Sequence, residues 1–133
     1  MALQFQTALR NTWLDAIETA VGTSPKLRIS TGSAPADCAA ADTGTLLVEL
    51  SLPSDWLNAA SAGAKTKNGT WSGTLSGGSA STPGHHRIKD TAGANVFLQG
   101  TCGIGSGDLS FDGTFTSGQT VTITTYTLTA PGA

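Results

Sequence analysis

The chain has 133 residues, of which 12% are charged, and its formal net charge is −2. This length suits one domain with its own hydrophobic core, so we expect residues 1–133 to form a single domain. The seven Lys and Arg residues are scattered, no apolar run reaches membrane-spanning length, and Met1 is not followed by the basic and apolar segments of a signal peptide. We therefore expect synthesis inside the cell and neither a nucleic-acid nor a membrane partner.

The first six residues alternate between apolar and smaller or polar side chains. Met1, Leu3 and Phe5 hold the apolar positions. Two interpretations stay open: residues 1–6 form a short edge strand of this chain, or they form an arm that adds to the sheet of a neighbouring molecule. Three large apolar side chains are costly to expose unless they are docked. Met1, Leu3 and Phe5 are therefore candidate partner contacts.

One segment, residues 7–22 (TALRNTWLDAIETAVG), has a helical period. Its large apolar residues recur at four-residue steps and form one stripe: Leu9, Trp13, Ile17 and Val21. Such a stripe is typical of an amphipathic helix, and we expect it to cover this chain's own sheet. Thr7 is predicted to cap the helix N-terminus, and Gly22 stands where a left-handed C-cap is favoured.

Residues 26–130 read as short strands separated by Gly-rich turns. The clearest strands are, in chain order, 45–52, 85–90, 94–101 and 119–130. The second and third are predicted to form a hairpin, because residues 90–93 have Asp at the first and Gly at the fourth position of a type I turn. In the last of the four segments the apolar residues occupy odd positions at first and even positions later, so they change from one face of the strand to the other. Either both faces of the strand are covered, or a bulge switches the inward face. Residues 61–69, with two lysines, and residues 77–84 are predicted to be exposed loops. Seven or eight strands without helical crossovers predict a mainly β fold, an antiparallel sandwich or jelly-roll-like barrel with one N-terminal helix.

Neither the cysteines nor the histidines form a pattern typical of a metal or catalytic site. Two cysteines make no disulfide framework, and we favour buried free thiols at Cys38 and Cys102 over a single bridge. His85 and His86 are adjacent on a predicted strand, so their side chains point to opposite faces and cannot easily share one metal. We expect both to be polar residues at a loop edge. No cofactor or metal ion is expected.

Catalytic motifs are also missing from the sequence. A glycosidase needs two facing carboxylates, and Asp108 and Asp112 would share one strand face without an opposing partner. The loop at residues 103–107 (GIGSG) matches neither a nucleophile elbow nor a phosphate loop. We therefore expect no enzyme. Of the three tryptophans, Trp56, beside a turn after Pro53, is predicted to be the most exposed, and exposed aromatic residues mark protein interfaces or sugar-binding platforms. A single Trp in a turn is more often a local plug of the core, so this alternative stays open.

Several stretches together carry a family resemblance: 10–19 (RNTWLDAIET), 27–35 (LRISTGSAP) leading to 38–42 (CAAAD), 52–56 (LPSDW) and 115–123 (FTSGQTVTI). They resemble a family of small virion structural proteins of tailed bacteriophages and prophages, and the likeness spans most of the chain. Residues 61–84 carry none of these motifs.

The resemblance implies a non-enzymatic component of the virion, made in the bacterial cytoplasm and present in many copies. Capsid decoration (cement) proteins are common small β-rich members of such particles, so the first hypothesis is a dimeric or trimeric decoration protein that binds the major capsid protein or other virion proteins. A neck or tail component is the competing assignment. The sandwich and Trp56 also keep open a carbohydrate-binding module of a tail or head fibre.

Overall fold

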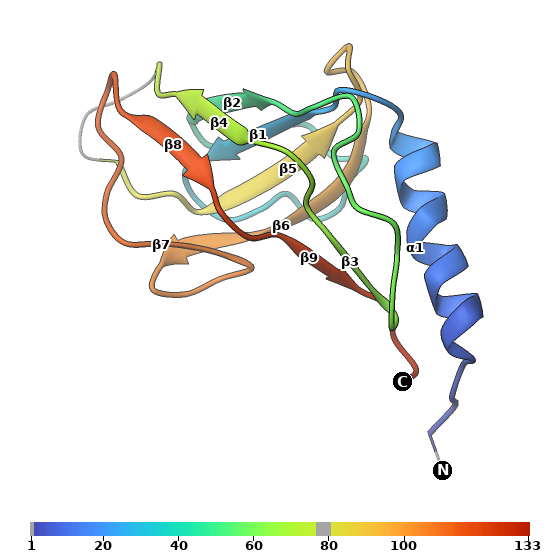
Figure 1. Cartoon of the computed structure of the whole chain (residues 1–133). Helices are drawn as coiled ribbons and strands as arrows, with labels where there is room; N and C mark the ends of the chain where they lie inside the picture. The colour runs from blue at the N-terminus through green and yellow to red at the C-terminus, as the bar shows by residue number, and fades with distance from the viewer. Residues whose placement is uncertain (1, 77–80) are drawn as a thin grey trace.

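A computed structural model describes residues 2–76 and 81–133, and it shows one N-terminal helix followed by short strands (Figure 1). The elements are α1 (Thr7–Val21), β1 (Lys26–Ser30), β2 (Leu46–Ser51), β3 (Ala64–Thr66), β4 (Trp71–Thr74), β5 (His85–Lys89), β6 (Val96–Ile104), β7 (Leu109–Phe111), β8 (Thr120–Ile123) and β9 (Thr127–Thr129). The prediction of a mainly β fold with one N-terminal helix is confirmed, with nine strands in the described residues. Part of the predicted loop at 77–84 lies outside these residues.

The strands form one larger curled sheet and two small ones, which together resemble a half-barrel. The larger sheet has the order β2-β1-β5-β6-β7, and β3 pairs with β9 and β4 with β8 in two-stranded sheets. All pairs are antiparallel except β6 with β7. In Figure 1, α1 runs beside the end of the molecule that holds β3 and β9, and both chain termini lie there.

The hydrophobic core lies on one face of the larger sheet. Leu27 and Ile29 of β1 are fully buried and lie opposite Leu50 and Val48 of β2 in the antiparallel register. This strict alternation follows from the two-residue period of a strand, which sends every second side chain to the same face. The predicted hairpin is also confirmed, because β5 and β6 are joined by a turn in which Gly93 N–H donates to the Asp90 carbonyl over 2.9 Å.

The opposite face of the sheet is polar and is covered by residues 31–45, which we name the strap. Sheet side chains bond to strap carbonyls: His85 Nδ1 lies 3.0 Å from Gly32 O, and Gln99 Nε2 donates to Pro35 O over 2.9 Å. Strand β5 is therefore buried on both faces. The prediction that His85 and His86 are polar residues at a loop edge is wrong, because both are buried: the strap covers one ring and the core covers the other.

The predicted C-terminal strand at 119–130 is two strands. β8 pairs with β4 and β9 pairs with β3, so the chain leaves one small sheet and joins the other at residues 124–126. Val121 is buried before this break and Leu128 is half-buried after it. The parity switch in the sequence marks the end of a strand, not a bulge within one.

The glycines at 103–107 allow a very tight return of the chain. β6 and β7 are parallel although only residues 105–108 connect them, whereas parallel strands usually need a long crossover. Gly105 and Gly107 have φ of +69° and +90°, and a Cβ at Gly107 would lie 3.0 Å from the Cys102 backbone. Asp108 completes the turn by accepting the Thr101 N–H over 2.8 Å.

The predicted apolar stripe of the helix faces the core only in its second half, where Val21 is buried and Ile17 packs against the core. The buried residues of the helix are Arg10, Leu14 and Val21, whereas Leu9 and Trp13 are 41% and 39% exposed. The predicted packing of Trp13 against the sheet is therefore wrong. Arg10 takes an inward position because its guanidinium donates to the Ala130 carbonyl over 2.8 Å, a contact that a hydrophobicity pattern does not reveal.

The ends of the helix agree only in part with the predicted caps. Gln6 is the N-cap residue and makes no side-chain cap bond, so Thr7 does not act as the cap. Gly22 does end the helix, with φ of +89° and its N–H donating to Glu18 O over 2.9 Å. Glycine adopts this left-handed conformation without the strain that a Cβ would cause.

Candidate functional site

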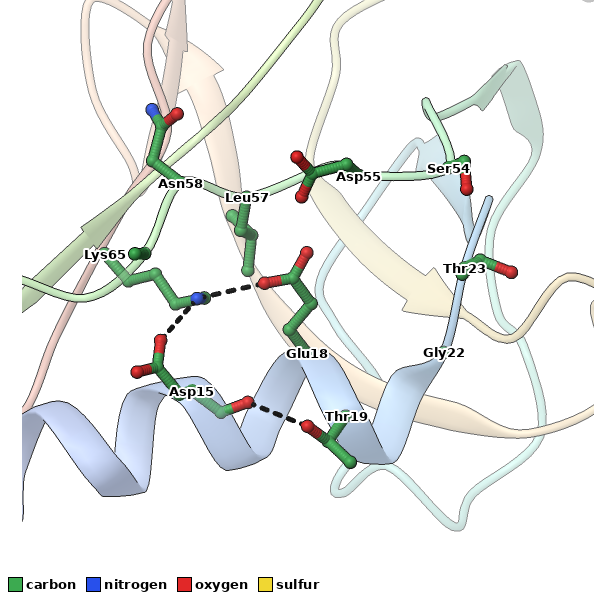
Figure 2. A pocket seen from close by; sticks show the side chains of 11 residues that line it. Asp15, Glu18, Thr19, Gly22, Thr23, Ser54, Asp55, Leu57, Asn58 and Lys65 are labelled. Atoms are coloured by element: carbon green, nitrogen blue, oxygen red, sulfur yellow. Dashed lines mark hydrogen bonds and ion pairs between the residues drawn. The ribbon is translucent and has the colours of Figure 1, made fainter.

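A buried lysine fixes the helix to the rest of the chain. Lys65 Nζ lies 2.7 Å from Asp15 Oδ1 and 3.0 Å from Glu18 Oε2, and its side chain is 2% exposed (Figure 2). Burial alone would lower the pKa of the ammonium, but the hydrogen bonds to the two carboxylates outweigh it and raise the pKa. The prediction of an exposed loop at 61–69 is wrong here, because this segment contains β3 and is covered by α1.

A groove of about 740 Å³ lies beside this lysine, between α1 and residues 54–59. Figure 2 shows carboxylates of Asp15, Glu18 and Asp55 around it. The hydrogen bond from Lys65 and that from the Ala60 N–H lower the pKa of Asp15. A glycosidase acid needs the opposite, a carboxyl whose pKa is raised. The pKa shift of Asp15 is therefore opposite in direction to that of a glycosidase acid, and this carboxylate acts as a structural partner of Lys65.

Trp56 does not form a platform in this groove. Its side chain is fully buried, and its Nε1–H donates to the Gly22 carbonyl over 3.1 Å. The ring packs against Trp71, with 6.0 Å between the ring centroids. The predicted exposure of Trp56 is wrong and the alternative, a plug of the core, is correct, because an apolar residue next to a proline turn can point inward as readily as outward. Among the described residues that line the groove, none is aromatic.

One exposed stripe of α1 consists of apolar side chains, while Thr12, Asp15 and Thr19 are exposed on the neighbouring side of the helix. Leu9, Trp13, Ala16 and Ala20 follow one another at three- and four-residue steps and are all exposed. The charged residues of the helix all bond to the chain itself: Arg10, Asp15 and Glu18. A helix that merely faces water usually carries charged and polar residues on its outer side. This stripe therefore has the character of a contact surface.

The N-terminal segment extends this exposed stripe. Residues 2–6 form no strand, so the edge-strand interpretation is not supported. Phe5 packs edge-on against Trp13 with 4.7 Å between ring centroids, and its N–H donates to Gly132 O over 2.8 Å. Leu3, two residues earlier, is 76% exposed. Met1 lies outside the described residues.

We name the surface formed by Leu3, Phe5, Leu9 and Trp13 the N-terminal apolar surface. Of the predicted contact residues, Leu3 and Phe5 lie on this surface, whereas Trp56 is buried in the core and is not available for contact. Leu9 and Trp13 were missed as outward-facing residues. A signal for them existed in the sequence, because all three charged residues of the helix fall on the side of Leu14, which leaves the opposite side uncharged.

A cysteine and a histidine meet inside the core, but neither is activated. Cys102 Sγ lies 3.5 Å from His86 Nδ1, and His86 Nε2 lies 3.1 Å from the Tyr126 hydroxyl. A Cys–His pair can act as a nucleophile when the thiol is deprotonated. Here burial lowers the pKa of His86 to about 4 and raises that of Cys102 to about 12, so both are neutral at pH 7. Cys38 and Cys102 are both free thiols, as predicted, but only Cys102 is buried as expected, whereas Cys38 is half-buried.

The structure of residues 2–76 and 81–133 offers no candidate metal site. In these residues no three His, Cys, Asp or Glu side chains are placed to hold a metal ion. None of the described helical segments is both long and apolar enough to span a membrane. Comparison of the chain with protein-family models, with curated proteins and with solved structures finds no match.

Proposed function

We propose that this chain is a non-enzymatic structural protein of a tailed-bacteriophage virion, a decoration protein that binds the outer capsid shell and stabilises neighbouring capsomers. The observation that carries the proposal is the N-terminal apolar surface, where Leu9 and Trp13 stand exposed on an apolar stripe of the helix. The family resemblance supplies the setting: synthesis in the bacterial host, location in the virion, and the major capsid protein or another virion protein as the partner.

The composition of this surface suits a protein contact. Interface cores are depleted in charged residues and enriched in aromatic ones, and Trp is among the residues that contribute most binding energy. Leu3 and Phe5 beside Trp13 add apolar area that water does not favour. Repetition of such a contact by symmetry, in a dimer or trimer bound to several shell subunits, turns modest single contacts into strong attachment.

The experiment measures attachment to capsids that lack the protein, by co-sedimentation, and self-association by analytical ultracentrifugation. Trp13→Gln is expected to weaken one of these at least tenfold, because removal of a central aromatic contact typically costs about 2 kcal/mol or more. Deletion of residues 2–6 should act in the same direction. Phe97→Gln is the matched control, since Phe97 is another aromatic residue of similar exposure, 38%, but lies on β6.

Three results bear directly on the proposal. If Trp13→Gln and Phe97→Gln behave alike, or if deleting the arm changes neither property, the N-terminal apolar surface is not the contact. The position of the protein in a reconstruction of the whole virion separates a shell decoration protein from a neck or tail component. A carbohydrate-binding module loses its main support, because the Trp56 ring is buried.

A further inference from the structure

Four of the seven Lys and Arg residues gather on the strap-covered face of β1 and β5. In the antiparallel register Arg28 lies directly opposite Arg87, and Lys26 lies opposite Lys89. Like charges at directly opposed positions destabilise a sheet. Glu49 of β2 lies 2.6 Å from Arg28 and 3.9 Å from Lys26, so the cations that Glu49 does not pair with are Arg87 and Lys89 of β5.

One carboxylate of the strap, that of Asp42, forms ion pairs with three of these four cations. Asp42 Oδ1 lies 2.6 Å from Arg87 Nη1, while Asp42 Oδ2 lies 2.6 Å from Lys89 Nζ and 3.6 Å from Arg28 Nη1. The hydrogen bond from Lys89 is the main cause of the lowered pKa of Asp42. Arg87 and Lys89 are 3% and 6% exposed, whereas the Asp42 side chain is 46% exposed. Two buried cations therefore share one carboxylate that faces partly into water.

A cavity of about 690 Å³ opens next to these cations. Residues 38–42 of the strap form one wall and residues 94–96 form the other, and both Arg87 and Lys89 line it. The charged groups of the lining are two cations and one carboxylate, so one positive charge is in excess. Asp37 and Asp90 lie close in sequence, but their carboxylates accept backbone N–H groups of their own turns and do not line the cavity.

The two buried cations also keep unused hydrogen-bond donors. An ammonium has three N–H donors, and within the described residues Lys89 Nζ bonds only to Asp42. Arg87 Nη1 and Nη2 are bonded to Asp42 and to the carbonyls of strap residues 37 and 38, but buried Nε has no partner among the described residues. Buried donors are normally satisfied. Gln99 Oε1 is also unpaired, but as an acceptor it adds nothing to the demand for an anion.

From the cavity, its excess positive charge and these unused donors, we infer a binding site for an oxyanion, a carboxylate or phosphate group, between the strap and the β5–β6 hairpin. Lys89 is the main ligand, because it lines the cavity and its ammonium bonds only to Asp42 among the described residues. Such a group can belong to a free anion or to an Asp or Glu side chain of a partner protein. The inference does not depend on the proposed virion role.

The test adds inorganic phosphate, or a blocked peptide of four glutamates, to the full-length protein at constant ionic strength held with chloride. Binding is followed by the NMR signal of Arg87 Nε–H and by the thermal midpoint. We expect a saturable shift of that signal and a rise of the midpoint, with half-saturation in the millimolar range for phosphate. Tighter binding of the peptide identifies a protein side chain as the source, and tighter binding of phosphate identifies a free anion.

Ala94→Glu and Ala94→Gln form the decisive pair of variants. Ala94 is exposed on the cavity wall, so a glutamate there places a carboxylate in the site, while glutamine keeps its size without the charge. The first variant should lose the response to phosphate and the second should retain it, as should Lys67→Gln, which removes a cation outside the site. A response that is not saturable, or that is equal in the two Ala94 variants, would overturn the inference.

Discussion

Replacement of Trp56 by Phe tests the largest difference between the sequence-based expectation and the structure. The substitution removes the hydrogen bond from Nε1 to the Gly22 carbonyl and leaves that oxygen without this donor. An unsatisfied buried group costs about 1–3 kcal/mol. Loss of part of a fully buried ring costs about 1–2 kcal/mol more, because the surrounding core does not close completely around the smaller side chain.

The expected sum is about 2–5 kcal/mol, a large part of the roughly 5–15 kcal/mol by which domains of this kind are stable. Urea unfolding followed by circular dichroism measures it directly, and the thermal midpoint should fall on the order of 10 °C. Trp13→Phe is the matched control, since the Trp13 side chain is 39% exposed and should tolerate the same exchange at less than about 1 kcal/mol. Equal effects of the two substitutions would refute the placement of Trp56 in the core.

Three further predictions concern titratable groups. Burial lowers the pKa of His86 from 6.5 to about 4, so the unfolded chain takes up a proton at a higher pH than the folded chain does. The free energy of unfolding should therefore fall by about 3 kcal/mol between pH 6.5 and 4. His86→Gln should remove this pH dependence of the urea midpoint. The thiol of Cys102, with its pKa raised to about 12, should react with a disulfide reagent at pH 8 only after unfolding, whereas half-buried Cys38 should react in the native protein. The pKa of Lys65 is raised, so the stability that its ammonium contributes is complete below pH 10.5 and is lost as the pH rises through the pKa of the folded state. Lys65→Met should lower the urea midpoint more than Lys67→Met does, and it should abolish this loss of stability at alkaline pH.

The parts of the fold that the sequence predicts correctly are those governed by local patterns. The hairpin of β5 and β6 follows from two alternating runs around an Asp–Gly turn, and β2 follows from the run at 45–52. The end of the helix at Gly22 follows from the conformational freedom of glycine. In each case a few neighbouring residues carry the whole signal, because the alternation and the turn geometry are short-range properties.

The errors arise where residues far apart in the chain decide the outcome. Lys65 is buried because Asp15 and Glu18, about fifty residues earlier, pair with it, and Arg10 is buried because Ala130 offers a carbonyl. A pattern that assigns charged residues to the outside therefore misses the inward position of Arg10 and of Leu14 on the helix. The same error concealed the outward position of Trp13. Of the candidate surface, only the arm could be read from local alternation.

The charged residues of the chain bear on the proposed role in an assembly of many copies. All seven Lys and Arg residues make hydrogen bonds or ion pairs within the chain. Within residues 2–76 and 81–133, eight of the nine carboxylates do the same, Asp112 being the exception. Only 12% of the residues are charged and the formal net charge is −2, so the chain carries little charge to keep copies apart. Weak repulsion between copies, together with an exposed apolar stripe of the helix that carries Leu9 and Trp13, supports a role in which many molecules pack against one another or against a shell.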